Sequence, residues 1–258
     1  MIAYTLITGA SSGLGKDFAQ EYAKTKQNLI LVARRKDRLD ELANKLRSEH
    51  GVMVEVFSVD LSDDGAVQTF LDNLDPNWFI DRLINNAGFG WHGPYEDSDP
   101  ITLSAMIDVN VKALSVLTHH VISSMKTQQR GEILNVASMA AYTPGPYMTE
   151  YYATKAYVLS FSMALREELK PYGINVAALC PGPVHTEFFK VAANTPGTLM
   201  GRITLESLPV VQKAMRGLSR NQSVTIPGVA FNVGRIAMKL VPRSLSAKLI
   251  AKIQKTRG

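Results

Sequence analysis

The sequence predicts an α/β protein in which one parallel β-sheet carries helices on both faces. Short, continuous apolar segments, typical of buried parallel strands, alternate with helical patterns along the chain. The first of these segments runs straight into a glycine-rich turn that opens a helix. A length of 258 residues with 46% hydrophobic residues suits one sizeable core, and no repeat or linker divides the chain. We therefore expect a single, doubly wound domain over residues 1–258.

The expected strands are Ala3–Thr8, Asn28–Ala33, Val52–Val59, Ile80–Asn85, Glu132–Ser138, Ile174–Cys180 and Ser223–Ile226. The expected helices are Leu14–Lys26, Asp37–His50, Asp63–Leu74, Thr102–Lys126, Glu150–Lys170 and Leu205–Leu218. Gly51 suits a helix C-cap, and Pro171 cannot continue the helix before it. Residues 185–223 contain scattered Gly and Pro and are predicted to form a mobile substrate lid, whereas residues 229–258 are predicted to form a basic helical tail.

Positive charge is concentrated near the C-terminus. The net charge is +5, yet residues 207–258 hold ten basic residues and no acidic one, so the rest of the chain is net acidic. This region has one aromatic residue, Phe231, and no recognition motif, so we expect no nucleic-acid partner. Its final stretch places Leu245, Leu249 and Ile253 on one stripe beside several lysines. Two interpretations stay open: weak contact with an anionic membrane surface, or packing of the stripe on the domain or on a partner subunit.

The expected compartment is the cytoplasm. Cys180 is the one cysteine, so no intramolecular disulfide can form, which suits a reducing environment. The first strand begins at Ala3, which leaves no room for a leader, and no unbroken apolar run reaches the ~18 residues that span a bilayer. The five histidines and Cys180 lack the spacing of metal ligands, so we assign no metal.

The glycine-rich turn after the first strand predicts a dinucleotide site. It consists of Gly9, Ser11, Ser12, Gly13, Leu14 and Gly15. The glycines let the backbone approach a pyrophosphate closely, and the helix that follows offers unpaired N–H groups and a positive dipole end to the phosphates.

The second strand ends without the carboxylate that would bind the 2′-hydroxyl of NAD. Arg34 and Arg35 follow Ala33 there, and guanidinium groups bind phosphate through paired, charge-assisted hydrogen bonds. The pair therefore favours NADP(H). The alternative is that both arginines are solvated at the start of a helix.

Polar and small residues follow the third and fourth strands. Asp60, followed by Leu61, is placed to accept a hydrogen bond from adenine, or alternatively to cap the next helix. Asn86, Ala87 and Gly88 come after the fourth strand, where small residues let the backbone lie against a cofactor. The preceding Asn85 is a candidate for tying neighbouring strands together through backbone hydrogen bonds.

Tyr151 and Lys155 lie one turn apart on one face of a predicted helix. A phenol titrates near ~10, and a nearby ammonium group favours the phenolate and lowers that pKa. Ser138, which ends the fifth strand, is placed to hydrogen-bond a substrate oxygen, and Asn110 to orient a water beside the lysine. Tyr152 has no such lysine partner, so we expect it to be dispensable.

Together these motifs resemble the short-chain dehydrogenase/reductase family, and they occur in its order over residues 3 to about 228. The matching residues are Thr8–Gly15, Asn85–Gly88, Asn110, Ser138, Tyr151, Lys155 and Pro181–Thr186. The resemblance implies a Rossmann-like sheet of strand order 3-2-1-4-5-6-7. It also implies that Tyr151 is the general acid/base, that Lys155 lowers its pKa and holds the nicotinamide ribose, that Ser138 polarises the carbonyl, and that Asn110 supports a proton relay.

In the same resemblance the nicotinamide is lined by Pro181, Gly182, Val184 and Thr186. One departure is Ser12, where many NADP(H)-using relatives carry a basic residue, so cofactor choice rests on Arg34 and Arg35. Family members commonly pair through two long helices, which implies a homodimer or homotetramer. Aromatic and apolar residues just beyond the strand ends predict an apolar substrate pocket, and they are Phe89, Trp91, Tyr142, Tyr147, Met148, Phe188 and Phe189.

The leading hypothesis is an NADPH-dependent oxidoreductase that reduces a ketone or aldehyde on a fairly hydrophobic small molecule, or oxidises the corresponding alcohol. One alternative is reduction of a 3-oxoacyl thioester. The alternative from another class is a non-catalytic NADP-binding sensor or scaffold. Such proteins usually lose the tyrosine or the lysine, and both are present here.

Overall fold

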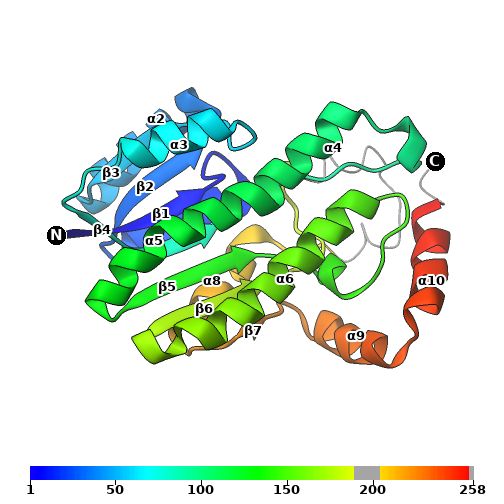
Figure 1. The fold of residues 1–258 in the computed structure, drawn as a ribbon. Helices are drawn as coiled ribbons and strands as arrows, with labels where there is room; N and C mark the ends of the chain where they lie inside the picture. The colour runs from blue at the N-terminus through cyan, green and yellow to red at the C-terminus, as the bar shows by residue number, and fades with distance from the viewer. Residues whose placement is uncertain (189–203, 256–258) are drawn as a thin grey trace.

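The computed structural model describes residues 1–188 and 204–255, and within them seven parallel strands form one sheet. The strands are β1 (Ile2–Thr8), β2 (Asn28–Ala33), β3 (Val54–Ser58), β4 (Trp78–Asn85), β5 (Gly131–Val136), β6 (Ile174–Leu179) and β7 (Val224–Thr225). Their order is β3-β2-β1-β4-β5-β6-β7, as the sequence predicted. The α/β class and the sheet order are therefore confirmed, and all carboxyl ends of the strands meet at one edge (Figure 1).

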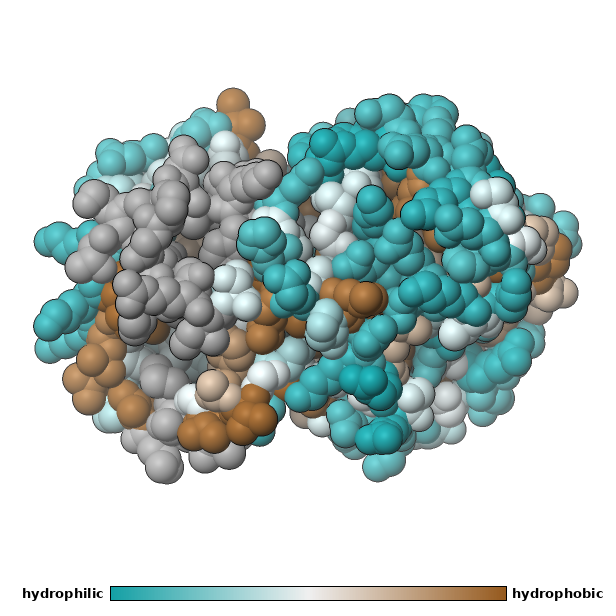
Figure 2. All heavy atoms as spheres, turned by 180° about the vertical axis from the view of Figure 1, so that it is seen from behind, coloured by the Kyte–Doolittle hydropathy of each residue, from teal (hydrophilic) through white to brown (hydrophobic). Residues whose placement is uncertain are grey.

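The helices cover both faces of the sheet (Figure 1). They are α1 (Gly13–Lys24), α2 (Lys36–His50), α3 (Asp64–Asp72), α4 (Pro100–Ile107), α5 (Leu114–Gln128), α6 (Thr149–Leu169), α8 (Ser207–Ser219), α9 (Val229–Leu240) and α10 (Arg243–Lys255). On one face, α1, α2 and α8 pack a core that includes Phe18 and Leu39, and on the other α3 and α5 pack one that includes Phe70 and Leu117. In the view from behind, the side away from the residues drawn in grey is mostly hydrophilic, as the outer faces of amphipathic helices require (Figure 2).

The long helix expected over 102–126 differs from the prediction. Asp99 caps an earlier start by accepting hydrogen bonds from the backbone N–H groups of Ile101 and Thr102. The segment Asp108–Ala113 is a π-helix that separates α4 from α5 and carries Asn110. Residues 100–128 are also long and apolar enough to cross a membrane, a test that core helices of globular proteins also pass. Here α5 packs against β4, which accounts for part of that apolar character.

The basic tail forms two helices, and α10 packs on the domain by a different face from the stripe that the sequence singled out. Ser246 and Gln254 are buried, and Ile250 packs on a cluster of Ala140, Met148 and Tyr152. Leu245 and Leu249 remain 49% and 47% exposed. The predicted stripe is thus one residue out of register with the packed face. Membrane contact through the exposed leucines stays a prediction.

Candidate active site

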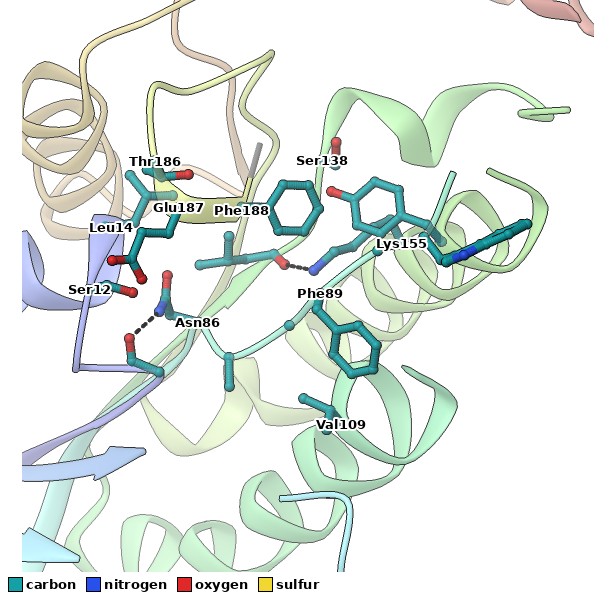
Figure 3. Close-up of a pocket in the computed structure, with 18 of the residues that line it drawn as sticks. Ser12, Leu14, Asn86, Phe89, Val109, Ser138, Lys155, Thr186, Glu187 and Phe188 are labelled. Carbon is teal, nitrogen blue, oxygen red and sulfur yellow. Dashed lines mark hydrogen bonds between the residues drawn. The ribbon is translucent and has the colours of Figure 1, made fainter. Parts of the chain in front are cut away.

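One pocket of about 770 Å³ opens at the carboxyl edge of the sheet (Figure 3). Its walls come from the turn between β1 and α1, the ends of β2, β4 and β5, the start of α6, and residues 181–188. Gln254 of α10 closes one side. Because the strands are parallel, residues far apart in the sequence converge at this edge, which is where α/β sheets place ligands.

The glycine-rich turn forms a cradle that side chains would fill. Gly9 and Gly13 have φ of +66° and +52°, a region that disfavours other residues. A Cβ on Gly15 would lie 2.3 Å from the Gly9 carbonyl oxygen, and one on Gly13 would lie 3.0 Å from the Thr186 methyl. Ser12 caps α1 without a side-chain hydrogen bond, so the first N–H groups of the helix stay open toward the pocket. This cradle suits a pyrophosphate.

The two predicted phosphate-binding arginines differ in their contacts. Arg35 donates to Ser11 and Ser12 Oγ and forms an ion pair of 2.8 Å with Glu187, which also pairs with Arg38. These two arginines lower the pKa of Glu187 to about 2 through hydrogen bonds and charge. Arg35 therefore braces the glycine-rich turn.

Arg34 is exposed at the pocket rim. Its backbone carbonyl accepts a hydrogen bond from Ser58, and its charge lies near Asp60. In the part of the chain described, its guanidinium makes no ion pair like that of Arg35. Arg34 is thus the arginine that is better placed to meet a further phosphate.

The sequence left two roles open for Asp60, an adenine contact and the cap of the next helix, and in the structure a different residue is the cap. Asp63 caps α3 by accepting from Ala66 N–H at 3.1 Å. Asp60 instead accepts from the backbone and hydroxyl of Ser62 at 3.0 and 2.7 Å and lines the pocket beside Leu61, at the position expected for an adenine contact.

Asn86 and its neighbours join β4 to β1. Asn86 Nδ2 donates to the Thr8 carbonyl at 2.9 Å, and the N–H groups of Asn86 and Ala87 both donate to Thr8 Oγ1 at 3.0 Å. Asn85 ties the sheet together through its backbone, as we expected, because it pairs with Asn135 in the ladder between β4 and β5, and its side chain adds further bonds. Its Nδ2 donates to Asn135 and to Thr118, each at 2.9 Å.

Ser138, Tyr151 and Lys155 all line the pocket, and Figure 3 labels Ser138 and Lys155 there. Burial raises the pKa of Tyr151, and a hydrogen bond with Ser138 opposes that rise. Lys155 is 5% exposed, and its Nζ donates to the Val136 carbonyl at 2.8 Å. Burial lowers the Lys155 pKa to about 8.

The Lys155 ammonium lies 5.8 Å from the centre of the Tyr151 ring. The sequence predicted a lowered pKa for Tyr151, whereas the structure, which holds no cofactor, gives a raised one. The reason is that the Val136 carbonyl holds the ammonium group and burial dominates the environment of the phenol.

Asn110 holds the loop that follows β4 in place. Its Oδ1 accepts from Phe89 N–H at 3.0 Å, and its Nδ2 donates to the Phe89 carbonyl at 2.9 Å and to Thr154 Oγ1 at 3.1 Å. A Cβ on Gly88 would lie 2.9 Å from Asn110 Oδ1 and 3.2 Å from Lys155 Nζ, so glycine is needed there. The part expected of Asn110 in a proton relay stays a prediction.

Four of the predicted apolar residues line the pocket, namely Phe89, Trp91, Met148 and Phe188. Tyr142 does not line it, because its ring packs beside Cys180 and its hydroxyl lies 3.8 Å from the Cys180 sulfur. Tyr147 does not line it either, since φ of +66° turns the residue toward His92, with the ring centres 6.4 Å apart. Phe189 and the rest of the lid segment 189–203 lie outside the described residues, whereas residues 207–219 of the predicted lid form α8, which packs on the core.

The predicted nicotinamide-lining residues Pro181, Gly182, Val184 and Thr186 all line the pocket. Glu187, Thr102 of α4 and Gln254 also line the pocket, and the sequence did not point to them. Glu187 follows a predicted site residue directly, so its position was a usable signal. For Gln254 no local signal exists, because its place depends on how α10 docks.

Comparisons with known proteins agree with this geometry. Residues 3–196 match the family model for short chain dehydrogenases. The very-long-chain 3-oxoacyl-CoA reductase of Rattus norvegicus is 33% identical over 74% of this chain and 62% of its own length, so the match leaves over a third of that enzyme uncovered. Sulfoacetaldehyde reductase 2 of Chromohalobacter salexigens is 38% identical over 71% of this chain and 73% of its own length.

Among solved structures, a short-chain dehydrogenase from Sphingobium yanoikuyae in complex with NADPH superimposes with a TM-score of 0.81 at 34% identity, covering 94% of this chain and 96% of that one. The bulky-bulky ketone specific alcohol dehydrogenase from Comamonas testosteroni gives a TM-score of 0.79 at 30% identity, covering 95% of this chain and 96% of that one.

Proposed function

Because the chain belongs to the short-chain dehydrogenase/reductase family, we propose that it is an NADPH-dependent reductase of ketones or aldehydes on fairly hydrophobic small molecules. The observation that carries this proposal is the convergence of Ser138, Tyr151 and Lys155 beside the glycine cradle, in a pocket with aromatic walls. The presence of both Tyr151 and Lys155 argues against a non-catalytic sensor or scaffold.

The nicotinamide, when bound, supplies the hydride that reduces the carbonyl carbon. Ser138 donates a hydrogen bond to the carbonyl oxygen and polarises it. The Tyr151 phenol is protonated at neutral pH, as an ordinary phenol is, and burial raises its pKa further; it gives its proton to that oxygen. Lys155 carries a positive charge below pH about 8 and stabilises the phenolate left on Tyr151.

Arg34 supports the choice of NADPH over NADH. The position is exposed, lines the pocket where β2 ends, and carries a cation where an NAD-selective protein would place a carboxylate. The NADPH in the Sphingobium yanoikuyae structure supports the same choice. Asp60 and Leu61 would lie against the adenine end of the cofactor.

The test is consumption of NADPH or NADH, followed by absorbance, with three carbonyl classes: propiophenone, decanal and acetoacetyl-CoA. We expect turnover with NADPH on the ketone or the aldehyde. Turnover on the thioester alone would favour 3-oxoacyl reduction, the candidate that the rat relative suggests. Tight NADPH binding without turnover on any of a wide carbonyl panel would favour the sensor.

A further inference from the structure

The last turn of α10 brings a buried amide to the substrate pocket. Gln254 is 1% exposed and lines that pocket. It lies on the face of α10 that packs on the domain through Ile250, next to Met148 and Tyr152 at the start of α6. Figure 1 shows α10 at the end of the molecule where α6 begins. The tail therefore contributes a polar group to an otherwise apolar wall.

Only one end of this amide is satisfied. Its Nε2 donates to the Tyr152 hydroxyl at 3.3 Å and lies 3.8 Å from the Met148 sulfur. Its Oε1 has no hydrogen-bond partner among the described residues. A buried acceptor left unpaired is costly, and native proteins seldom retain one without a use. A glutamine that served only to dock α10 would be expected to pair both of its ends.

Gln254 reaches the pocket beside the residues of the reacting centre. Tyr152, which holds Nε2, neighbours the catalytic phenol, and the ring centres of Tyr151 and Tyr152 are 6.2 Å apart. A substrate whose carbonyl meets Tyr151 would extend past these rings toward α10. Surrounded by Met148 and Ile250, a neutral acceptor favours a neutral donor, because a charged group would lose its hydration without a counter-ion.

We propose that Gln254 is a specificity-determining residue that selects carbonyl substrates carrying a hydroxyl group away from the reacting carbonyl. The amide oxygen accepts the hydrogen bond from that hydroxyl. This inference rests on the proposed function. It predicts that the preferred substrate is a hydroxylated hydrophobic ketone or aldehyde, and that a matched compound without the donor is handled less well.

The test compares each of the three ring-hydroxylated propiophenones with its methyl ether, which has a similar electronic effect on the carbonyl but lacks the donor. We measure kcat/KM with NADPH, and the Kd of the same ketones in the presence of NADP⁺ by calorimetry. The wild-type protein should favour at least one hydroxy ketone over its methyl ether about tenfold, the factor that one neutral hydrogen bond supplies.

Gln254→Met keeps the length of the side chain and removes the acceptor, so the ratio should fall to about one. Lys248→Met, at an exposed position of the same helix, is the matched control and should leave the ratio unchanged.

A wild-type ratio near one for all three pairs would overturn the proposal. So would a ratio that survives in Gln254→Met, which would indicate simple steric rejection of the ether. Equal losses for both members of a pair in Gln254→Met would make the residue an anchor for α10 and overturn it too. Absence of any carbonyl reduction would instead refute the proposed function itself.

Discussion

Asn110→Leu should weaken the fold and distort the site together. The substitution keeps the volume of the side chain and removes both hydrogen bonds to the Phe89 backbone, which measure 3.0 and 2.9 Å. Asn110 is 1% exposed, so no water can simply take its place. The Phe89 N–H and carbonyl would lose their partners. The hydrogen bond from Asn110 to Thr154 Oγ1 would also be lost.

Each buried polar group left unpaired costs about 1–3 kcal/mol. Phe89 is only half-buried, so we take the lower part of that range and expect a loss of about 2–4 kcal/mol in the free energy of unfolding. For a protein of this size the midpoint of thermal unfolding should fall by roughly 4–16 °C.

The assay is thermal unfolding followed by circular dichroism, together with turnover of NADPH on an accepted carbonyl. Turnover should fall at least tenfold at a temperature where the variant is folded, because Gly88 packs closely against both Asn110 Oδ1 and Lys155 Nζ, so a shift at Asn110 would disturb the site. Asn44→Leu, at an exposed position of α2, is the control and should change the midpoint little. An unchanged midpoint and turnover in Asn110→Leu would refute the reasoning.

Three further predictions concern the cofactor, the pH dependence and the assembly. Arg34→Asp should lower NADPH affinity at least tenfold and reverse the preference over NADH in calorimetry, whereas Lys45→Asp, at an exposed position of α2, should not; retained NADPH preference in Arg34→Asp would contradict the assignment. The kcat/KM for reduction should stay level below pH about 8 and fall above it, because Lys155 then loses the charge that stabilises the phenolate; the same falling limb in Lys155→Arg would show that another group titrates. Light scattering should give a multiple of 28.3 kDa, because α4 and α6 expose Ile107, Tyr157 and Met163; a monomer at micromolar concentration would rule out the homo-oligomer.

The sequence predicted those features that depend on residues close together in the chain, such as turn conformation and helical spacing. The glycine-rich turn could be placed because its backbone conformation requires glycine, and the strand order followed once the motifs matched a family. The spacing of Tyr151 and Lys155 placed both on one helix face, and the structure brings them to one pocket.

Features set by long-range packing could not be predicted in the same way. The break at 108–113 lies where Asn110 bonds Phe89 in the loop after β4, and nothing in the helical pattern signals that contact. Tyr142 packs beside Cys180 and does not line the pocket. This position depends on Cys180, which is distant in sequence, so the residues around Tyr142 could not predict it. The tail stripe was one residue out of register, because only docking on Met148 and Tyr152 decides which face of α10 is buried.

The most direct test of the central claim is the turnover of an accepted carbonyl by Tyr151→Phe beside Tyr152→Phe. The two tyrosines are adjacent on α6, but only Tyr151 hydrogen-bonds Ser138, whereas Tyr152 contacts Gln254. Tyr151→Phe should lower kcat about 10²–10⁴-fold while NADPH binding is retained, and Tyr152→Phe should stay within a few-fold of the wild type. Similar turnover in the two variants would contradict the assignment of Tyr151 as the proton donor.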